Sequence, residues 1–207
     1  MERIIPDNKN ERPLAYYTQQ FQNASPDEMS MRSGFSFDPT CSAFQFHFLG
    51  QELWMTYPDM EVKKSDGTRI EAPAIRILLA RALLIGKVQE SSGRYLAYAE
   101  VPWGNVYLQQ FTGRCVSRLA FGFGRQLDVF ERACSALGGV PSTGADKGFT
   151  IEFLDGLYIR LLIWAPDEEF PPSAQILFSD NFPAMYTAED LAVVGDVLIN
   201  TLKTIQK

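Results

Sequence analysis

The chain has 207 residues, of which 46% are apolar and 21% are charged. Both fractions are close to the averages of globular domains and exclude a disordered chain. The 19 basic and 25 acidic residues leave a net charge of −6, without a run of Lys or Arg. Nucleic acids and anionic membrane surfaces select basic proteins, so we expect neither as a partner. The length predicts a single domain over residues 1–207.

Neither a targeting segment nor a membrane span is expected. The N-terminal stretch MERIIPDNKNERP is polar and charged, and the apolar run 74–86 is interrupted by Arg76 and Arg81 and is too short to cross a bilayer. The cysteines are odd in number and widely spaced, and they are Cys41, Cys115 and Cys134. We therefore predict reduced thiols in a soluble, cytoplasmic protein, with one reactive thiol as the alternative.

The first third of the chain predicts two helices and then a hairpin. A helix is expected over 12–24, and a second should start at Ser25-Pro26, with Ser25 as cap and Glu28 completing a capping box. Gly34 would end it in the left-handed conformation. The alternation in 43–49 then indicates a half-buried strand. A turn at Gly50-Gln51 would pair it with a strand over 52–57.

The remaining segments group their strands and their helices. Helices are expected over 72–86, 105–121, 125–137 and 188–204, the last capped from Thr187. Strands are expected over 94–102, 149–154, 157–164 and 174–179, with a hairpin at Asp155-Gly156. Clustered strands favour an α+β fold with a largely antiparallel sheet packed against helices, including a C-terminal helix.

The chain lacks the residues that several common catalytic and binding sites require. His47 is the single histidine of the chain. Zinc and iron sites use Cys and His ligands, and Cys41 and His47 are the only such pair within ten residues of each other. No nucleotide-binding glycine loop and no nucleophile elbow is present, and FGFGRQ (121–126) follows a predicted helix instead of a strand. We expect no metal site, and no motif indicates a cofactor. His47 falls on the polar face of its predicted strand, where exposure or a surface hydrogen bond is expected, and a role as base or ligand is the alternative.

One candidate site is the run that begins at Trp164 and continues through Asp167, Glu168 and Glu169. Three consecutive carboxylates repel one another, so they either stay solvated or face a cation. An exposed turn capped by Asp167, a salt bridge to a distant arginine, and a cation or substrate site are the alternatives.

A second candidate is the pair Arg114 and Arg118, which lie four residues apart and so share one helix face with Gln110. Two guanidinium groups on one face suit the recognition of a carboxylate or a phosphate. A solvated face, or pairing with acids such as those at 167–169, are the alternatives.

The order of these segments in residues 95–204 resembles the domain-of-unknown-function family 3786, proteins of bacteria and archaea that are common in anaerobes. The resemblance rests on YLAYAEVPWGNVY (95–107), on Leu-Gly-Gly at 137–139 and on the strand, DEEFP, strand and helix order of 157–199. It implies an accessory role near redox or corrinoid enzymes. Some relatives are similar to fusions with a cysteine-rich iron–sulfur segment, and this chain lacks such a cluster.

Three functions remain as hypotheses. The first is a non-catalytic accessory protein of anaerobic metabolism that binds a small anionic ligand or a protein partner. The second is an enzyme that uses the carboxylates at 167–169, with Arg114 or Arg118 orienting an anion. The third is a structural oligomer, in which Trp103 and Phe123 would form an exposed patch.

Overall fold

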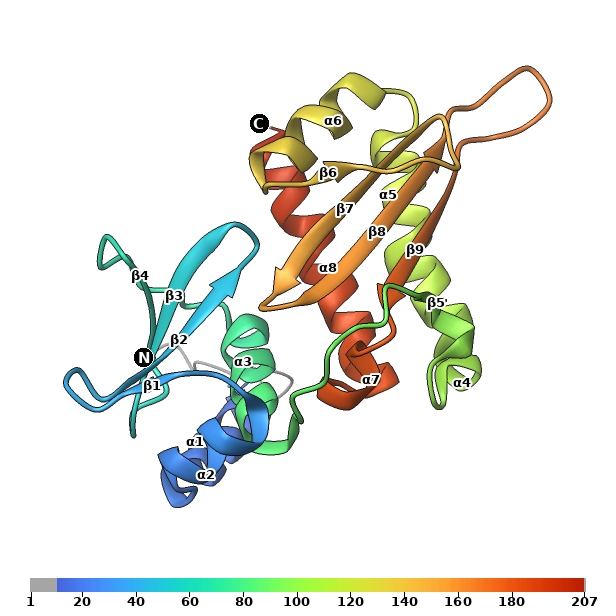
Figure 1. Cartoon of the computed structure of the whole chain (residues 1–207). Coiled ribbons are helices and arrows are strands. Elements are labelled where there is room, and N and C mark those ends of the chain that lie inside the picture. Colours follow the sequence, from blue (N-terminus) through green and yellow to red (C-terminus); the bar gives the residue numbers. More distant parts are fainter. Residues whose placement is uncertain (1–10, 207) are drawn as a thin grey trace, which may run out of the picture. The chain divides into compact units, whose positions relative to one another are not determined.

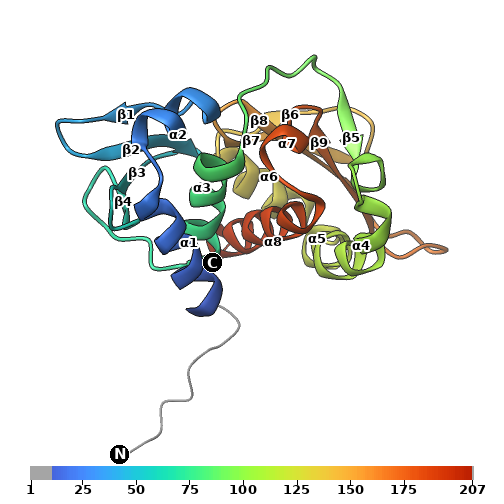
Figure 2. The same ribbon diagram turned by 90° about the horizontal axis from the view of Figure 1, so that it is seen from below.

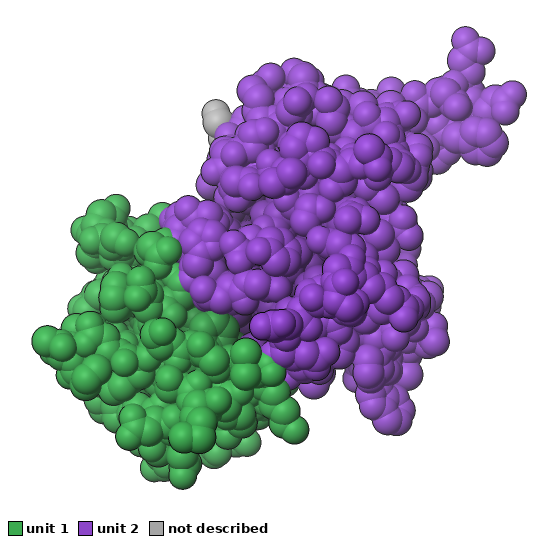
Figure 3. Space-filling model, viewed as in Figure 1, with its two compact units in different colours: residues 1–46, 52–88 green, residues 47–51, 89–207 purple. Residues whose placement is uncertain are grey.

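The computed structural model describes residues 11–206, so the first ten residues of the polar N-terminal stretch lie outside the described part. Its contacts divide the chain into two compact units, drawn in different colours in Figure 3. Unit 1 comprises residues 52–88 and the described part of 1–46, and unit 2 comprises 47–51 and 89–207. The single domain expected over 1–207 stays a prediction.

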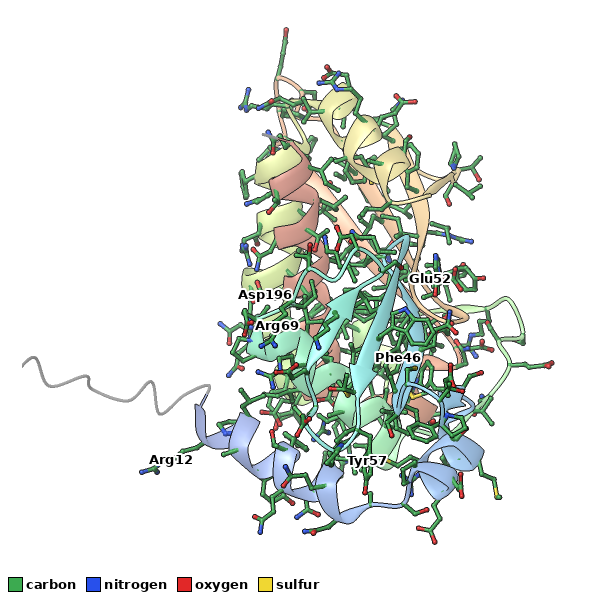
Figure 4. All side chains as sticks on the ribbon, turned by 90° about the vertical axis from the view of Figure 1, so that its left-hand side faces the viewer. Arg12, Phe46, Glu52, Tyr57, Arg69 and Asp196 are labelled. Carbon is green, nitrogen blue, oxygen red and sulfur yellow. The ribbon has the colours of Figure 1, made fainter. Side chains whose placement is uncertain are left out.

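Unit 1 combines three helices with short antiparallel strands (Figure 1). Its elements are α1 (Glu11–Asn23), α2 (Pro26–Ser33), β1 (Phe37–Asp38), β2 (Ala43–Phe48), β3 (Gln51–Thr56), β4 (Val62–Lys64) and α3 (Pro73–Ile85). The alternation seen in the sequence is confirmed, because Phe44 and Phe46 are fully buried while Gln45 is exposed. Phe46 on β2 and Tyr57 after β3 are labelled in Figure 4.

Two local predictions in this unit need correction. Ser25 precedes α2 but makes no side-chain capping bond, and Pro26 at the first position together with Gly34 in the left-handed conformation (φ 82°) delimits the helix instead. The turn between β2 and β3 lies one residue earlier than expected. Leu49 and Gly50 both have positive φ, which matches the right-handed twist of the two strands.

Unit 2 is an antiparallel sheet with helices packed on it. The elements are β5 (Tyr95–Ala97), α4 (Gly104–Phe111), α5 (Ser117–Phe123), α6 (Leu127–Ala136), β6 (Val140–Pro141), β7 (Lys147–Leu154), β8 (Leu157–Trp164), β9 (Ser173–Ser179), α7 (Phe182–Met185) and α8 (Ala188–Ile205). The strands run in the order β7, β8, β9, β5, and β6 and the end of β2 both pair with β7. The predicted α+β class with a largely antiparallel sheet is confirmed.

Figures 1 and 2 show α4, α5 and α8 along one face of this sheet. Side chains alternate between the two faces of a strand. The residues that face the helices, among them Phe149, Ile151, Ile159 and Phe178, are fully buried, and they form the core with the apolar stripe of α8. Thr187 caps α8 by accepting the amide of Asp190, as the sequence predicted.

The segment 94–123 differs from its prediction in two places. The strand expected over 94–102 ends at Ala97, because the Glu100 carboxylate accepts the Ala97 amide (2.7 Å) and closes a 3-10 turn. The helix expected over 105–121 is continuous from α4 to α5 but contains a π-helical stretch, Thr112–Val116. Such stretches shift the face that a helix presents to its neighbours.

Candidate functional site

The predicted arginine pair has a carboxylate partner of its own. Arg114 donates from Nη2 to Oδ2 of Asp196 (2.8 Å), and Arg118 bonds the other oxygen of the same carboxylate. Arg118 also donates to Oδ1 of Asn200 (2.6 Å). Asp196, labelled in Figure 4, lies on α8, so these bonds tie the helical stretch of Arg114 and Arg118 to the C-terminal helix.

The charge of this cluster is partly cancelled. Burial alone would raise the pKa of Asp196, but the hydrogen bonds and charges of Arg114 and Arg118 outweigh burial and hold the pKa below its usual value. The carboxylate therefore stays ionised at neutral pH and neutralises one of the two arginine charges. The geometry is that of a structural ion cluster.

The acidic candidate lies in the loop that projects between β8 and β9 (Figures 1 and 2). Oδ1 of Asp167 accepts the amides of Glu169 (2.9 Å) and Phe170 (2.7 Å), so this carboxylate closes the turn. Glu168 and Glu169 are exposed, and Trp164 is half-buried at the end of β8. Within residues 11–206, no ion pair joins Asp167, Glu168 or Glu169 to Arg114 or Arg118.

An open hollow of about 450 Å³ lies at the base of that loop, lined by Gly124, Arg125, Leu127, Asp128, Ala165 and Pro166. Its volume is that of a small-molecule site. Asp128 lies in the first turn of α6 and pairs with Arg132 (3.0 Å). The hollow thus carries exposed Arg125 beside an exposed ion pair.

The sheet face opposite the helices holds a second group of polar side chains. We call it the polar face, made of Tyr95 on β5, Thr150 and Glu152 on β7, and Tyr158 and Arg160 on β8, with His47 of β2 beside it. Register places Glu152 opposite Tyr158 and Thr150 opposite Arg160. The hairpin turn at Asp155-Gly156 joins β7 to β8, and β5 is placed through β9, where Tyr95 lies opposite Ser179.

His47 is held against the polar face by two kinds of contact. Its Nδ1 lies 3.0 Å from Oε2 of Glu152. Its backbone is fixed as well, since its amide donates to Oδ2 of Asp155 (3.0 Å) and its carbonyl accepts the Asp155 amide (3.1 Å). The side chain remains 37% exposed. This partial exposure of His47 is as expected for the polar face of its strand.

Glu152 joins several of these groups. Its Oε1 accepts the amide of Gly156 (2.7 Å), which anchors the carboxylate to the hairpin turn. Tyr158 lies opposite Glu152 in the strand register. Burial first, and then the charge and hydrogen bonding of Glu152, raise the pKa of Tyr158. The phenol therefore stays protonated over the neutral range and serves as a donor on the polar face.

Arg160 is the cation of the polar face. Its guanidinium carbon lies 3.9 Å from the centre of the Tyr95 ring. Its Nε donates to Oγ1 of Thr150 (3.4 Å), and that hydroxyl also bonds Oγ of Ser142 (2.8 Å). In the part of the chain that the structure describes, no carboxylate pairs with Arg160. Its two terminal nitrogens are therefore left to solvent or to a ligand.

Sequence reasoning missed most of this group. The signal for the sheet residues was present, because Thr150 and Glu152 alternate with apolar residues, as do Tyr158 and Arg160 on the next strand. The turn at Asp155-Gly156 then fixes which of them are neighbours. No comparable signal links His47 to Glu152, since that contact depends on a long-range strand pairing, Phe48 with Leu154.

Two further observations concern the described residues alone. None of the helices in residues 11–206 is long and apolar enough to cross a membrane. The same residues contain no group of three or more His, Cys, Asp or Glu side chains that could hold a metal ion.

The patch expected from Trp103 and Phe123 does not form, because Trp103 is exposed but Phe123 is fully buried.

A protein-family model described as "Domain of unknown function (DUF3786)" matches residues 25–201 of the 207. The chain belongs to this family. No curated protein and no solved structure matches it. The match covers nearly all of the chain, so both the arginine cluster and the polar face of this DUF3786 protein lie within the family region.

The cysteines of this DUF3786 protein are dispersed. Cys115 and Cys134 are buried and Cys41 is exposed, all three as free thiols. Burial raises the pKa of Cys115 to about 12 and also raises the pKa of Cys134. Thiols that are buried and protonated are poor nucleophiles and poor metal ligands, so Cys115 and Cys134 act as small apolar core residues.

Proposed function

We propose that this DUF3786 protein is a ligand-binding protein that holds the carboxylate or phosphate group of a small molecule at Arg160 on the polar face. One observation carries the proposal. Arg160 is half-buried and fixed by Tyr95 and Thr150, yet no carboxylate pairs with it among residues 11–206. A guanidinium presents parallel donors that fit the two oxygens of a carboxylate or phosphate.

Preorganisation supports this choice over the other cations. A long arginine side chain loses rotamer entropy when it binds, at a cost of about 0.5–1.5 kcal/mol. Stacking on Tyr95 and the bond to Thr150 already restrict the rotamers of Arg160, so less entropy is lost when the ligand binds. Arg125, by contrast, is exposed beside Asp128, and Arg114 and Arg118 already share Asp196.

The alternative is an enzyme that uses Asp167, Glu168 and Glu169 with an arginine that orients an anion. Such a site needs carboxylates that converge with their cations in a desolvated cleft. Asp167 instead closes a turn, and both glutamates are exposed. The binding function is therefore the better supported of the two. Its setting in the cytoplasm of anaerobes is part of the same proposal.

The direct test is calorimetric titration of the full chain with inorganic phosphate and, separately, with succinate. We expect at least one of them to bind, and Arg160→Gln to weaken binding about tenfold or more, because one charge-assisted bond pair is worth about 1.5–3 kcal/mol. Arg125→Gln is the matched control and should bind like the parent. Equal affinity in Arg160→Gln and the parent would refute the proposal.

Tyr95→Leu separates orientation from charge. The substitution keeps the cation but removes the ring beneath it. We expect weaker binding than in the parent but stronger binding than in Arg160→Gln, since cation–π contacts contribute about 0.5–2 kcal/mol. An unchanged affinity in Tyr95→Leu would show that the stacked geometry does not contribute.

A further inference from the structure

The segment between β8 and β9 carries apolar surface that the rest of the chain leaves uncovered. We call residues 165–172 the β8–β9 loop, and it projects from unit 2 in Figures 1 and 3. Phe170 in this loop is 65% exposed, and Pro171 beside it is exposed as well. Aromatic side chains are enriched at protein interfaces, so an exposed ring on a projecting loop is suited to anchor one.

The β8–β9 loop is ordered by its own contacts. The amide of Asp167 donates to the carbonyl of Phe170 (3.1 Å), and Oδ1 of Asp167 accepts the Phe170 amide (2.7 Å). At the end of the loop, Pro172 is buried against Gly124, where an added Cβ would lie 2.4 Å from the Cβ of Pro172. A loop that is already ordered loses little entropy when it binds.

The hollow at the base of the same loop is the counterpart of this projection. Leu127, Ala165 and Pro166 line it with apolar groups, and Arg125 adds a cation. Its volume of about 450 Å³ is large enough to admit an aromatic side chain. One surface of unit 2 therefore presents both an apolar projection and an apolar hollow.

The charges of the loop and of the hollow are complementary. Glu168 and Glu169 are exposed on the loop, and Arg125 is exposed at the hollow. Among residues 11–206, none of these three forms an ion pair. Asp128 and Arg132, by contrast, pair with each other (3.0 Å). Two acids and one cation of the same surface are thus left for a partner.

We propose that two copies of this chain associate through this surface, with the β8–β9 loop of each copy lying in the hollow of the other. Phe170 packs against the apolar lining of the hollow, and the acids of the loop meet Arg125. A twofold contact requires a surface that is complementary to itself, and each of its interactions then occurs twice. Projection and hollow, and acid and cation, fulfil this requirement.

Other occupants match the surface less well. A small anion would meet the single unpaired charge of Arg125 in an open hollow, and it would leave Phe170 uncovered. An unrelated protein would have to supply both a ring with acids for the hollow and a second hollow with a cation for the loop. A second copy of the chain supplies all of these at once.

Sedimentation velocity of the full chain tests the association. We expect a reversible monomer–dimer equilibrium between about 1 μM and about 1 mM, a range that covers weak and moderate affinities. Phe170→Ala should raise the dissociation constant about tenfold or more, because each dimer loses two buried rings. Trp103→Ala, which removes a side chain that is 77% exposed before α4, is the matched control. A chain that stays monomeric, or a dimer that Phe170→Ala leaves intact, overturns the proposal.

Charge reversal shows whether the contact is reciprocal. Arg125→Glu and the double variant Glu168→Arg/Glu169→Arg should each dimerise about tenfold or more weakly than the parent, because each brings like charges together. Mixed in equal amounts, the two variants should form a heterodimer with about the parental affinity, since both pairs are restored with their signs exchanged. A mixture that associates no better than the separate variants overturns the proposal.

Discussion

Oε2 of Glu152 holds Nδ1 of His47 at 3.0 Å, and these two residues come from strands that are far apart in the sequence. The contact gives the single histidine a fixed ring orientation on the open side of the sheet. It also has a direct spectroscopic consequence, because a hydrogen bond from Nδ1 decides which nitrogen of the neutral ring keeps the proton.

We predict the Nδ1–H tautomer for neutral His47 in the parent protein. Glu152→Ala removes the acceptor, and the ring should then shift toward the Nε2–H form. Long-range 1H–15N NMR of the side chain reads both nitrogens without overlap, since the chain has one histidine. Glu131→Ala, which removes an exposed partner of Lys147, should leave the tautomer unchanged. An Nε2–H tautomer in the parent would contradict the contact.

The arginine cluster should contribute to stability in a pH-dependent way. Asp196→Asn removes the charge that Arg114 and Arg118 share, and we expect a loss of about 1–3 kcal/mol in the free energy of unfolding at neutral pH. The folded-state pKa of Asp196 is depressed, so its stabilisation is present above the unfolded pKa of about 3.9 and is lost as the pH falls through the lower, folded value.

Urea unfolding of the parent and of Asp196→Asn from pH 7 to strongly acid solution measures this contribution. The difference between the two should stay constant down to about pH 4 and shrink below it. A difference that persists undiminished in acid would mean that packing, and not the ionised carboxylate, accounts for the effect.

Gly195 lets α8 approach the π-helical stretch closely. An added Cβ would lie 2.9 Å from Sγ of Cys115 and 3.4 Å from a ring carbon of Phe111. Alanine favours a helix interior by about 1 kcal/mol over glycine, but overpacking costs about 1–3 kcal/mol. We therefore expect Gly195→Ala to destabilise the protein, measured by urea unfolding.

A double-mutant cycle with Cys115→Ala tests the stated cause. In that background the sulfur is absent, and Gly195→Ala should become neutral or stabilising. Gly113→Ala is the matched control, because nothing lies within 4 Å of its added Cβ. Equal costs of Gly195→Ala in both backgrounds would show that contact with Cys115 is not the reason.

Thiol reactivity should follow burial. Cys41 is exposed, whereas Cys115 and Cys134 are buried. Ellman's reagent should therefore modify Cys41 alone in the folded protein and all three thiols in guanidinium chloride. Cys41→Ser should abolish the fast reaction. Rapid modification of two or three thiols in the folded state would contradict the buried placement.

How much of this could be predicted depends on the range of each interaction. The α+β class, the hairpin at Asp155-Gly156 and the Thr187 cap follow from local periodicity and turn chemistry, and all are confirmed. The prediction of a side-chain capping bond from Ser25 is wrong, since Pro26 and Gly34 delimit that helix without it. The π-helical stretch Thr112–Val116 has no local signal in the sequence.

The candidate sites show the same division. The four-residue spacing predicts that Arg114 and Arg118 share one helix face. Their partner, Asp196, lies on a helix far along the chain, and no sequence pattern predicts this contact. Asp167 does close a turn, which was one of its alternatives. Predicting the polar face requires the strand register of Glu152 and Arg160 and a long-range strand pairing for His47. The sequence does not supply the long-range pairing, so the polar face is seen only in the structure.

The central claim is that anions bind at Arg160 on the polar face, and NMR mapping of a phosphate titration tests it most directly. We predict that the largest shifts of amide and side-chain signals fall on Arg160, Tyr158 and Tyr95, with His47 affected as well. Shifts that concentrate instead at Arg114 and Arg118, or around Arg125 and the loop of Asp167, would contradict the account.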